Sequence, residues 1–206
     1  MKKKVLIFTG SRADYGLLKP LIYRFKKDIS SELILAVGGQ HFSKIFGNTY
    51  KEILKDNFII NYACPIKIDG IKDNDVVSYL GKSLVNFTKF LKKKTPDIVI
   101  LLGDRYEAYS FCLASFFLNI PIAHVHGGEL TSGAFDDGLR HSMTKFSNYH
   151  FTCHKNYTKR ITQLGENPKN IFNYGALGVE NAINTKLIDK KKLFNKFNIP
   201  LDKKKI

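Results

Sequence analysis

The sequence predicts an α/β fold built on a doubly wound, mostly parallel sheet. Short apolar runs alternate with stretches of helical spacing from residue 5 to about residue 175, the pattern of strands joined by crossover helices. Two of these runs end in glycine and ionisable side chains, in the segments Gly103–Arg105 and His126–Glu129. Ligands of open parallel sheets bind at the carboxyl ends of the strands. The sequence therefore predicts a ligand site at that edge of the sheet.

The first part of the chain predicts three strands. Val5–Thr9 is apolar and leads through the glycine-bearing turn Gly10–Gly16 into leucines at helical spacing. Leu33–Val37 is the second apolar run, and a helix is expected after it with apolar positions from Phe42 to Leu54. Phe58–Tyr62 is expected to be the third strand.

The rest of the chain continues the alternation. Apolar residues at helical spacing predict an amphipathic helix, which ends at Thr95-Pro96. The short apolar runs predict the strands. The expected elements are a loop at 66–75, a helix at 76–93, a strand at 98–102, a helix at 107–117, a strand at 120–125, a helix from about 136, a strand at 149–153, a helix at 154–164, a strand at 171–174, and short helices at 179–187 and 190–197.

Composition narrows the class of protein. The chain has 206 residues, 44% of them apolar, and no run approaches the roughly 18 apolar residues that a membrane span needs. The basic N-terminus leads into an apolar run too short for a signal peptide, so a cytoplasmic location and no membrane partner are expected. Cys64, Cys112 and Cys153 are too few and too far apart for a disulfide framework, and Cys112 is expected in the core.

The net charge of +15 raises the question of a nucleic-acid partner. The lysine clusters fall at the edges of elements and in the tail, and no basic platform interleaved with aromatic residues is present. No nucleic-acid partner is therefore predicted. A positive field would, however, steer an anionic small-molecule substrate toward the crevice.

The turn after the first strand has the features of a phosphate-binding unit. Arg12 offers a planar fork suited to a phosphate, although pairing with Asp14 at the start of the helix explains it equally well. The spacing is not the Gly-x-Gly-x-x-Gly dinucleotide fingerprint, so no nicotinamide cofactor is expected. His41 also lies just after a strand and just before a helix, a common place for a catalytic or substrate-contacting histidine, although a lone histidine is more often a helix-capping or surface residue.

Acid–base chemistry is the function that the remaining residues favour. Asp104, His126 and Glu129 lie at the predicted edge, with Arg105 and Arg140 available to hold an anion. Carboxylates and imidazoles packed together have shifted pKa values, the condition for proton transfer near neutral pH. Other candidates are Glu107 and Arg140, which are expected to point at the crevice. The helix that begins near Asp136 places Asp137, Arg140 and His141 on one face. Acidic residues in its first turn, Asp136 and Asp137, also suit the helix dipole.

Two other chemistries are disfavoured. A metal site is not predicted, because His124 and His126 lack a recognised ligand spacing and His124, inside a strand, is expected in the core. Covalent catalysis is disfavoured because the sequence has no Gly-x-Ser-x-Gly elbow and no cysteine is expected at a strand-to-helix turn beside a histidine. A sugar nucleotide suits what remains, since its diphosphate binds arginines and its sugar ring binds carboxylates and imidazoles.

A set of motifs, taken together, resembles a known family. The chain is similar to the hydrolysing UDP-N-acetylglucosamine 2-epimerases of bacterial sialic and legionaminic acid biosynthesis, over residues 5 to about 185. The motifs that carry the resemblance, in chain order, are Gly-Ser-Arg-Ala-Asp-Tyr-Gly at 10–16, Gly-Gln-His at 39–41, Gly-Asp-Arg-Tyr-Glu at 103–107, His-Val-His-Gly-Gly-Glu at 124–129, Asp-Asp-x-x-Arg-His at 136–141 and Gly-Ala-Leu-Gly at 175–178.

The resemblance implies a fold and a reaction. Members have two Rossmann-like domains of the GT-B type with the active site between them, and are expected to be homo-oligomers. They abstract the C2 proton of the sugar and expel UDP, giving a 2-acetamidoglucal that water converts to N-acetylmannosamine, with no nicotinamide and no obligatory metal. The residues implied are Asp104 as acid/base, Arg105 and Arg12 as nucleotide or sugar contacts, and His41, Glu129, Asp136 and His141 on the sugar side.

The sequence departs from the family in two places. Some branches carry Glu where this chain has His126, so His126, Glu129 and Asp104 all stay candidates for the C2 base. Relatives are also nearly twice as long. The chain is therefore interpreted as a Rossmann-like N-terminal domain, residues 1–178, with linker helices at 179–206 leading to a second domain absent from it, and low turnover is expected from the chain alone.

Three alternatives stay open at this point. The first is the same chemistry on a UDP-linked diacetamido-bacillosamine or a GDP-linked sugar. The second is a catalytically incomplete domain that only binds the sugar nucleotide. The third is a glycosyltransferase half-domain, and release of UDP without an acceptor would separate it from an epimerase.

Overall fold

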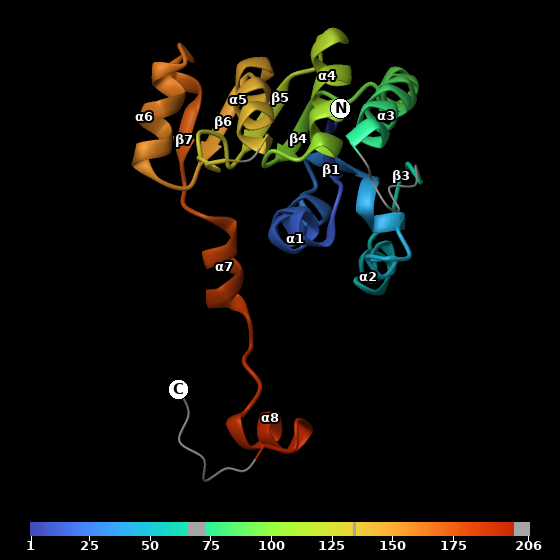
Figure 1. The fold of residues 1–206 in the computed structure, drawn as a ribbon, viewed down its shortest axis with the longest axis vertical. Coiled ribbons are helices and arrows are strands. Elements are labelled where there is room, and N and C mark those ends of the chain that lie inside the picture. The colour runs from blue at the N-terminus through green and yellow to red at the C-terminus, as the bar shows by residue number, and fades with distance from the viewer. Residues whose placement is uncertain (66–72, 134, 200–206) are drawn as a thin grey trace.

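A seven-stranded parallel sheet of order β3-β2-β1-β4-β5-β6-β7 forms the centre of the computed structural model, which describes residues 1–65, 73–133 and 135–199 (Figure 1). The predicted doubly wound sheet is confirmed. Its strands are β1 (Lys3–Thr9), β2 (Ser31–Val37), β3 (Tyr62–Ala63), β4 (Ile98–Leu102), β5 (Ile122–Val125), β6 (Tyr149–Thr152) and β7 (Ile171–Asn173).

Helices cover both faces of the sheet. In Figure 1, α3, α4 and α5 lie on one side, and α1 and α2 lie on the other. The α-helices are α1 (Arg12–Lys27), α2 (Tyr50–Lys55), α3 (Asp73–Lys94), α4 (Tyr106–Phe117), α5 (Asp136–Phe146), α6 (Lys155–Gln163), α7 (Leu177–Asn184) and α8 (Lys190–Lys196), and short 3-10 turns span Gly39–Phe42 and Pro168–Asn170.

The core has two layers because side chains alternate across a strand. On β1, Leu6 and Phe8 pack in the layer that contains α3 and α4, whereas Val5 and Ile7 pack in the layer that contains α1. Strands buried on both faces need apolar residues at every position, which explains why they read as continuous apolar runs. Cys112 is fully buried in the first layer, as expected.

Two predicted elements near α2 are wrong in extent. The helix expected to carry apolar positions from Phe42 to Leu54 is split into a 3-10 turn and the short α2. The backbone between them includes Gly47 at φ +84° and Asn48 at φ +50°. These left-handed conformations are incompatible with a continuing right-handed helix.

The third strand also differs from the expectation for residues 58–62. Phe58 is buried in the core, but pairing with β2 begins only at Tyr62, opposite Ala36. Just before it, the side-chain Oδ1 of Asn61 accepts the backbone N–H of Leu35 at 2.8 Å. The backbone N–H of Asn61 donates to the oxygen of Leu35 at 2.9 Å, so the side chain replaces only the acceptor that a backbone oxygen supplies in a regular ladder. Of the loop expected at 66–75, residues 66–72 lie outside the described residues, and α3 begins at Asp73.

The C-terminal helices are confirmed with slightly different bounds. Helix α7 packs on α1, where the Nη2 atom of Arg24 lies 2.7 Å from the Oε1 atom of Glu180 and the Nδ2 atom of Asn181 donates to the backbone oxygen of Gly16 at 2.7 Å. Helix α8 lies apart from the sheet (Figure 1). Within the described ranges, no helix has both the length and the apolar character to cross a membrane.

Candidate active site

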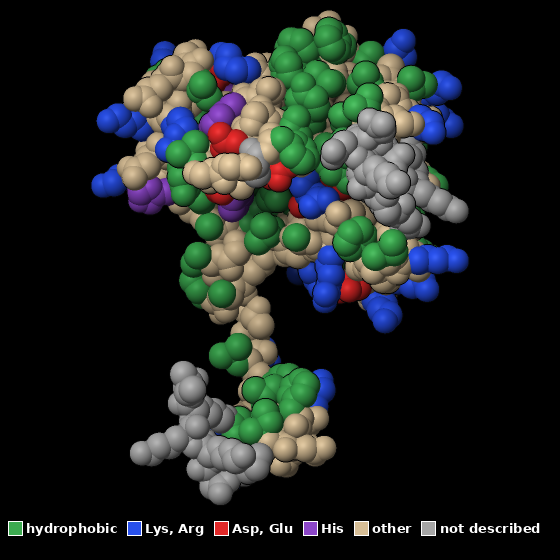
Figure 2. Space-filling view, viewed as in Figure 1, with side chains coloured by type: hydrophobic (Ala, Val, Ile, Leu, Met, Phe, Trp, Pro, Cys, Tyr) green, Lys and Arg blue, Asp and Glu red, His purple; other side chains and the backbone are tan. Residues whose placement is uncertain are grey.

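The register of the sheet brings the carboxyl ends of β4, β5 and β6 together. Leu102 pairs with Val125, and Val125 pairs with Phe151. The residues that follow these pairs therefore lie side by side, although they are far apart in sequence. Figure 2 shows acidic, histidine and basic (Lys or Arg) side chains close together near the middle of the sheet domain, while other basic side chains spread over the outer surface.

Arg140 joins the loops at this edge. Its side chain is only 7% exposed and pairs with the Oδ2 atom of Asp104 and, at 3.1 Å, with the Oε2 atom of Glu129. It also donates to the Oγ1 atom of Thr131 at 3.0 Å and to the backbone oxygen of His126 at 3.3 Å. A buried guanidinium needs such compensation, since an unpaired buried charge is costly. Arg140 therefore fixes the two carboxylates relative to each other.

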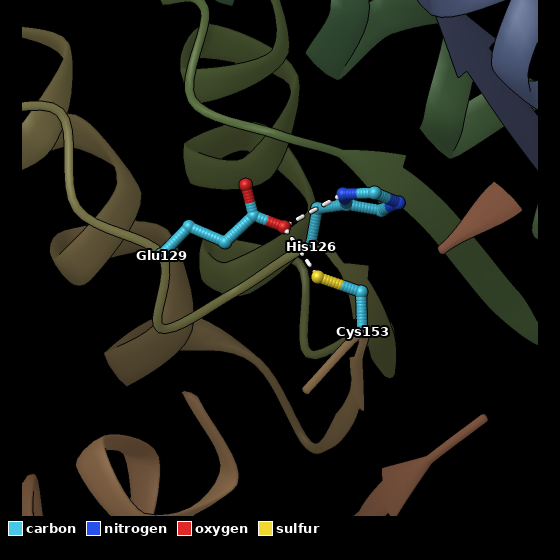
Figure 3. Close-up of side chains that lie close together, drawn as sticks. All are labelled: His126, Glu129 and Cys153. Atoms are coloured by element: carbon cyan, nitrogen blue, oxygen red, sulfur yellow. Dashed lines mark hydrogen bonds and ion pairs between the residues drawn. The ribbon is translucent and has the colours of Figure 1, made fainter. Parts of the chain in front are cut away.

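Glu129 accepts two further hydrogen bonds through its other oxygen, Oε1 (Figure 3). The Nδ1 atom of His126 lies 2.8 Å away and the Sγ atom of Cys153 lies 3.0 Å away. Burial alone would raise the pKa of Glu129, but these hydrogen bonds and the charge of Arg140 lower the pKa to about 2. Glu129 is therefore ionised at neutral pH, and because a carboxylate only accepts, His126 carries its proton on Nδ1.

The backbone of His126 directs its ring toward Glu129. His126 has φ +65°, a left-handed conformation, immediately after β5 ends. Histidine adopts this region more readily than most residues do. The side chain is 15% exposed, and its Nε2 atom is buried without a hydrogen-bond partner among the described residues. The hydrogen bond to Glu129 thus sets the orientation of the ring, and Nε2 is the nitrogen that it leaves without a partner.

Cys153 corrects one conclusion from the sequence. It lies between β6 and α6, beside His154, so a cysteine does occupy a strand-to-helix turn beside a histidine. The sequence prediction missed this because it ended β6 one residue later. Burial, together with the hydrogen bond to Glu129 and the charge of that residue, raises the pKa of the Cys153 thiol to about 12. A protonated thiol is a hydrogen-bond donor and a poor nucleophile.

A second cluster lies where β1 and β4 meet, the point at which the strand order reverses. Glu107 is fully buried and binds Arg105 through two hydrogen bonds, Nε to Oε2 at 3.2 Å and Nη2 to Oε1 at 3.1 Å. Asp14 is also buried and accepts the backbone N–H of Gly10 at 3.2 Å. Burial raises the pKa of both carboxyls, and the charge of Arg105 opposes that rise. The side chain of Glu107 was expected to point at the crevice, but it is buried in the protein and orients the guanidinium of Arg105 through these hydrogen bonds.

Gly39 allows the backbone to approach this second cluster closely. It has φ +58°, and a Cβ atom there would lie 2.7 Å from both the Cγ atom of Glu107 and the backbone oxygen of Gly10. Only glycine fits such a position without displacing its neighbours. The Gly39 turn therefore serves to seal the buried Glu107 carboxylate.

His41 lies beneath this edge and has no exposed surface. Its Nε2 atom lies 3.0 Å from the Oγ1 atom of Thr9, and its Nδ1 atom lies 2.8 Å from the Oγ1 atom of Thr49. Burial lowers the pKa of His41 to about 4, so the ring is neutral at physiological pH. With both nitrogens engaged, His41 links β1 to the loop before α2, and its role as a substrate contact stays a prediction.

His124 is a buried core histidine, as expected. Its Nε2 atom lies 2.7 Å from the backbone oxygen of Gly103, and its Nδ1 atom lies 3.2 Å from the Oγ1 atom of Thr144. Burial lowers the pKa of His124 to about 4. The ring therefore ties the Gly103 turn to α5 and supports the loop that carries Asp104.

The remaining predicted residues fall at the rim of the site. Arg12 is exposed and pairs with Glu52 of α2, Nε to Oε1 at 3.1 Å, and not with Asp14. Burial raises the pKa of Asp136, the charge of Asp104 adds to that rise, and the charges of Arg105 and Arg140 oppose it. Asp136 therefore lies within electrostatic range of both clusters.

His141 and Asp137 contact each other on α5, as their spacing predicts. The Nε2 atom of His141 lies 3.5 Å from the Oδ2 atom of Asp137, and the Oδ1 atom of Asp137 accepts the backbone N–H of Thr131 at 2.9 Å. Thr131, Cys153 and Glu52 were missed as partners by the sequence prediction. For Cys153 a signal existed, because it follows β6 just as Asp104 follows β4.

Acidification from about pH 6.5 to pH 4 is expected to destabilise the fold. The pKa values of His41 and His124 are about 4 in the folded protein and near 6.5 in the unfolded chain. Between these values the unfolded state binds more protons. The free energy of unfolding therefore falls as the pH falls, by up to about 1.4 kcal/mol per pH unit for each buried histidine. Urea denaturation at a series of pH values measures this slope.

Two histidine variants identify the source of that slope. His124→Asn is expected to make it shallower, because one unfolded-state proton is lost. His154→Asn is the matched control, because His154 is exposed and accepts the N–H of Asn156 at 3.2 Å, a cap that asparagine retains. An unchanged slope in His124→Asn would contradict the assignment.

The sheet order, with helices on both faces of the parallel sheet, defines the class of fold as a Rossmann-like α/β fold. A crystal structure of a UDP-N-acetylglucosamine 2-epimerase matches the fold with a TM-score of 0.80 at 21% identity, covering 92% of this chain and 52% of that one. The structure of the Neisseria meningitidis enzyme bound to UDP-GlcNAc matches with a TM-score of 0.78 at 18% identity, over 95% of this chain and 53% of that one.

The sequence comparisons show the family. The profile of the UDP-N-acetylglucosamine 2-epimerase family matches residues 24–205, and the chain belongs to that family. It is 40% identical to polysialic acid biosynthesis protein P7 of Escherichia coli, over 95% of this chain and 50% of that protein. It is 34% identical to a hydrolysing UDP-N,N'-diacetylbacillosamine 2-epimerase of Legionella pneumophila, over 99% of this chain and 54% of that protein. The chain thus spans about half the length of these relatives.

Proposed function

We propose that the chain provides the N-terminal half of the active site of a hydrolysing sugar-nucleotide 2-epimerase. UDP-N-acetylglucosamine is the proposed substrate, and free N-acetylmannosamine and UDP are the proposed products. In this proposal residues 1–178 form one domain and 179–206 lead to a second domain that closes the cleft. Family membership and the named relatives support the reaction class.

The hydrogen bond between His126 and Glu129 is the observation that carries the proposal. A carboxylate with a pKa of about 2 is a weak base. In the proposed mechanism it instead holds a proton on the Nδ1 atom of the imidazole, and Nε2, which has no hydrogen-bond partner among the described residues, accepts the proton from C2. A carboxylate that orients a histidine in this way is a recurring arrangement for general base catalysis. His126 is therefore the proposed base for the C2 proton.

The proposed reaction has two steps. The C2 proton moves to His126, the electron pair of the C2–H bond forms a C1–C2 double bond, and the C1–oxygen bond breaks to release UDP. Water then adds to the 2-acetamidoglucal, with hydroxide to C1 and a proton to C2 from the opposite face. Asp104 is the proposed acid/base for this second proton transfer, and its contact with Arg140 sets its position.

The positive groups are assigned to the nucleotide. Arg105, held by the buried Glu107, is the proposed diphosphate or sugar contact, because a guanidinium fixed from behind loses little entropy when it binds an anion. Arg12 would have to exchange its ion pair with Glu52 for a phosphate. Asp136 and His141 are the proposed contacts to the sugar hydroxyls.

The sugar is the part of the proposal with the strongest competitor. Relatives named as hydrolysing diacetylbacillosamine 2-epimerases act, by name, on a UDP-linked sugar in Legionella pneumophila and on GDP- or UDP-linked sugars in Campylobacter jejuni, and the chain is 34% and 37% identical to them. The same chemistry on such a substrate is therefore the second candidate. A domain that binds a sugar nucleotide without turnover is the third.

The deciding experiment is turnover in heavy water. The 206-residue chain and a chimera that joins residues 1–178 to the second half of the Escherichia coli relative are each incubated with UDP-N-acetylglucosamine. The proposal expects UDP release by the chimera, deuterium at C2 of free N-acetylmannosamine, and little turnover by the chain alone. Release from the bacillosamine-type substrate only would move the assignment to the second candidate. Binding of substrate without release of UDP would favour the third.

A further inference from the structure

Three side chains of different chemistry converge at one point of the candidate active site. One ligand atom from each of His126, Glu129 and Cys153 lies within 4.8 Å of the other two, and the Oε1 atom of Glu129 lies 2.8 Å from Nδ1 of His126 and 3.0 Å from Sγ of Cys153. Figure 3 shows the imidazole and the thiol both directed at the same carboxylate oxygen. The three come from separate segments, the end of β5, the loop after it and the turn after β6. The sheet therefore supports their geometry from two adjacent strands.

We propose that His126, Glu129 and Cys153 form a binding site for a divalent cation of the zinc class. Nitrogen, oxygen and thiolate sulfur are the three kinds of atom that zinc takes from proteins, at about 2.0–2.3 Å. Around a tetrahedral ion such atoms stand about 3.3–3.7 Å apart, whereas Oε1 lies 2.8 Å from Nδ1 and 3.0 Å from Sγ. A shift of roughly half an ångström at each side chain would open the position for the ion.

Proton and charge balance favour the same ion. Both hydrogen bonds to Oε1 are held by protons, one on the His126 ring and one on the Cys153 thiol. The ion would replace the thiol proton and the Nδ1 proton, and the imidazole would keep a proton on Nε2 instead. The carboxylate and the new thiolate neutralise the two positive charges. Arg140 contacts only the other oxygen of Glu129 and is itself paired with Asp104, so Oε1 stays available.

Binding would leave one position of a tetrahedral ion for water, as in other zinc sites with three protein ligands. It would also remove His126 and Glu129 from proton transfer, because Nδ1 would bind the ion instead of donating to Oε1. The ion should therefore inhibit turnover, a consequence that rests on the proposed function. The binding itself does not depend on that function, and a spectroscopic titration measures it separately.

Cobalt(II) is the probe for the experiment, because a cobalt–thiolate bond gives a charge-transfer absorption band. Metal-free chain is titrated with cobalt(II), and zinc(II) is then added to displace it. A stoichiometric band that zinc abolishes is the expected result. Cys153→Ser should remove the band and weaken zinc binding by about 100-fold or more, since a neutral hydroxyl replaces a thiolate ligand. His126→Asn, which suits the left-handed backbone, should weaken binding by about tenfold or more.

Cys112→Ala is the matched control, because Cys112 is buried in the core away from the three side chains. It should keep both the band and the zinc affinity. Circular dichroism checks that each variant is folded. Absence of the band in the wild-type chain, or its persistence in Cys153→Ser, would overturn the proposed site. An inactive chimera with an intact band would instead count against the proposed function only.

Discussion

Replacing Arg140 with methionine is expected to lower the free energy of unfolding by about 3–5 kcal/mol. The guanidinium is almost fully buried and compensates the charges of Asp104 and Glu129 at once. Methionine fills much of the same volume but leaves both carboxylates without their counter-ion in a partly desolvated site. Urea denaturation of the 206-residue chain near pH 7 measures the loss, and the result does not depend on enzymatic activity.

Arg24→Met provides the control for that measurement. Arg24 pairs with Glu180 at 2.7 Å, but its side chain is 74% exposed. Exposed ion pairs contribute about 0–1 kcal/mol, so this variant should unfold close to the wild-type chain. Equal destabilisation by the two substitutions would contradict the role of Arg140 as the centre of a buried charge network.

Replacing Asp104 with asparagine is expected to reduce formation of C2-deuterated N-acetylmannosamine by about 100- to 10,000-fold in the chimera described above, because Asp104 is the proposed donor of the second proton. Asparagine has nearly the same shape and can still accept a hydrogen bond from Arg140, so the fold should persist. The amide of asparagine cannot, however, take up or release a proton near neutral pH. The measurement is the rate of UDP release together with deuterium content at C2 of the product.

Asp28→Asn is the matched control, because Asp28 is exposed at the end of α1, at the opposite edge of the sheet, where its side chain accepts hydrogen bonds from Ser30. It should retain full activity. His126→Asn tests the proposed base in the same assay and should lose C2 deuteration by a similar factor. Wild-type rates in Asp104→Asn would remove Asp104 from the mechanism, and wild-type rates in His126→Asn would return the role of base to Glu129.

The sequence by itself determined the architecture. Strands buried on both faces must be apolar throughout, and the helices between them need one apolar face. For this reason β4 and α4 could be located to within one residue, whereas α3 begins three residues before its expected start. The candidate residues could be found for the same reason. Chain segments that leave a buried strand at its carboxyl end are few, and their ionisable side chains stand out against the apolar runs. Breaks within an element were harder to predict, because the helix expected from Phe42 to Leu54 is in fact split into a 3-10 turn and the short α2.

Only the tertiary structure decided which candidates pair with one another. Asp104 and Arg140 are 36 residues apart, and Glu129 and Cys153 are 24 residues apart, so their contacts depend on strand register and on loop conformation. The left-handed backbone of His126 turns its ring toward Glu129, and no periodicity in the sequence encodes that turn. Burial likewise separated Glu107, which supports Arg105 from below, from the groups that face the crevice. The spacing of apolar residues in the sequence predicts which face of a helix or strand is buried. An active site depends instead on where several loops meet in the folded chain.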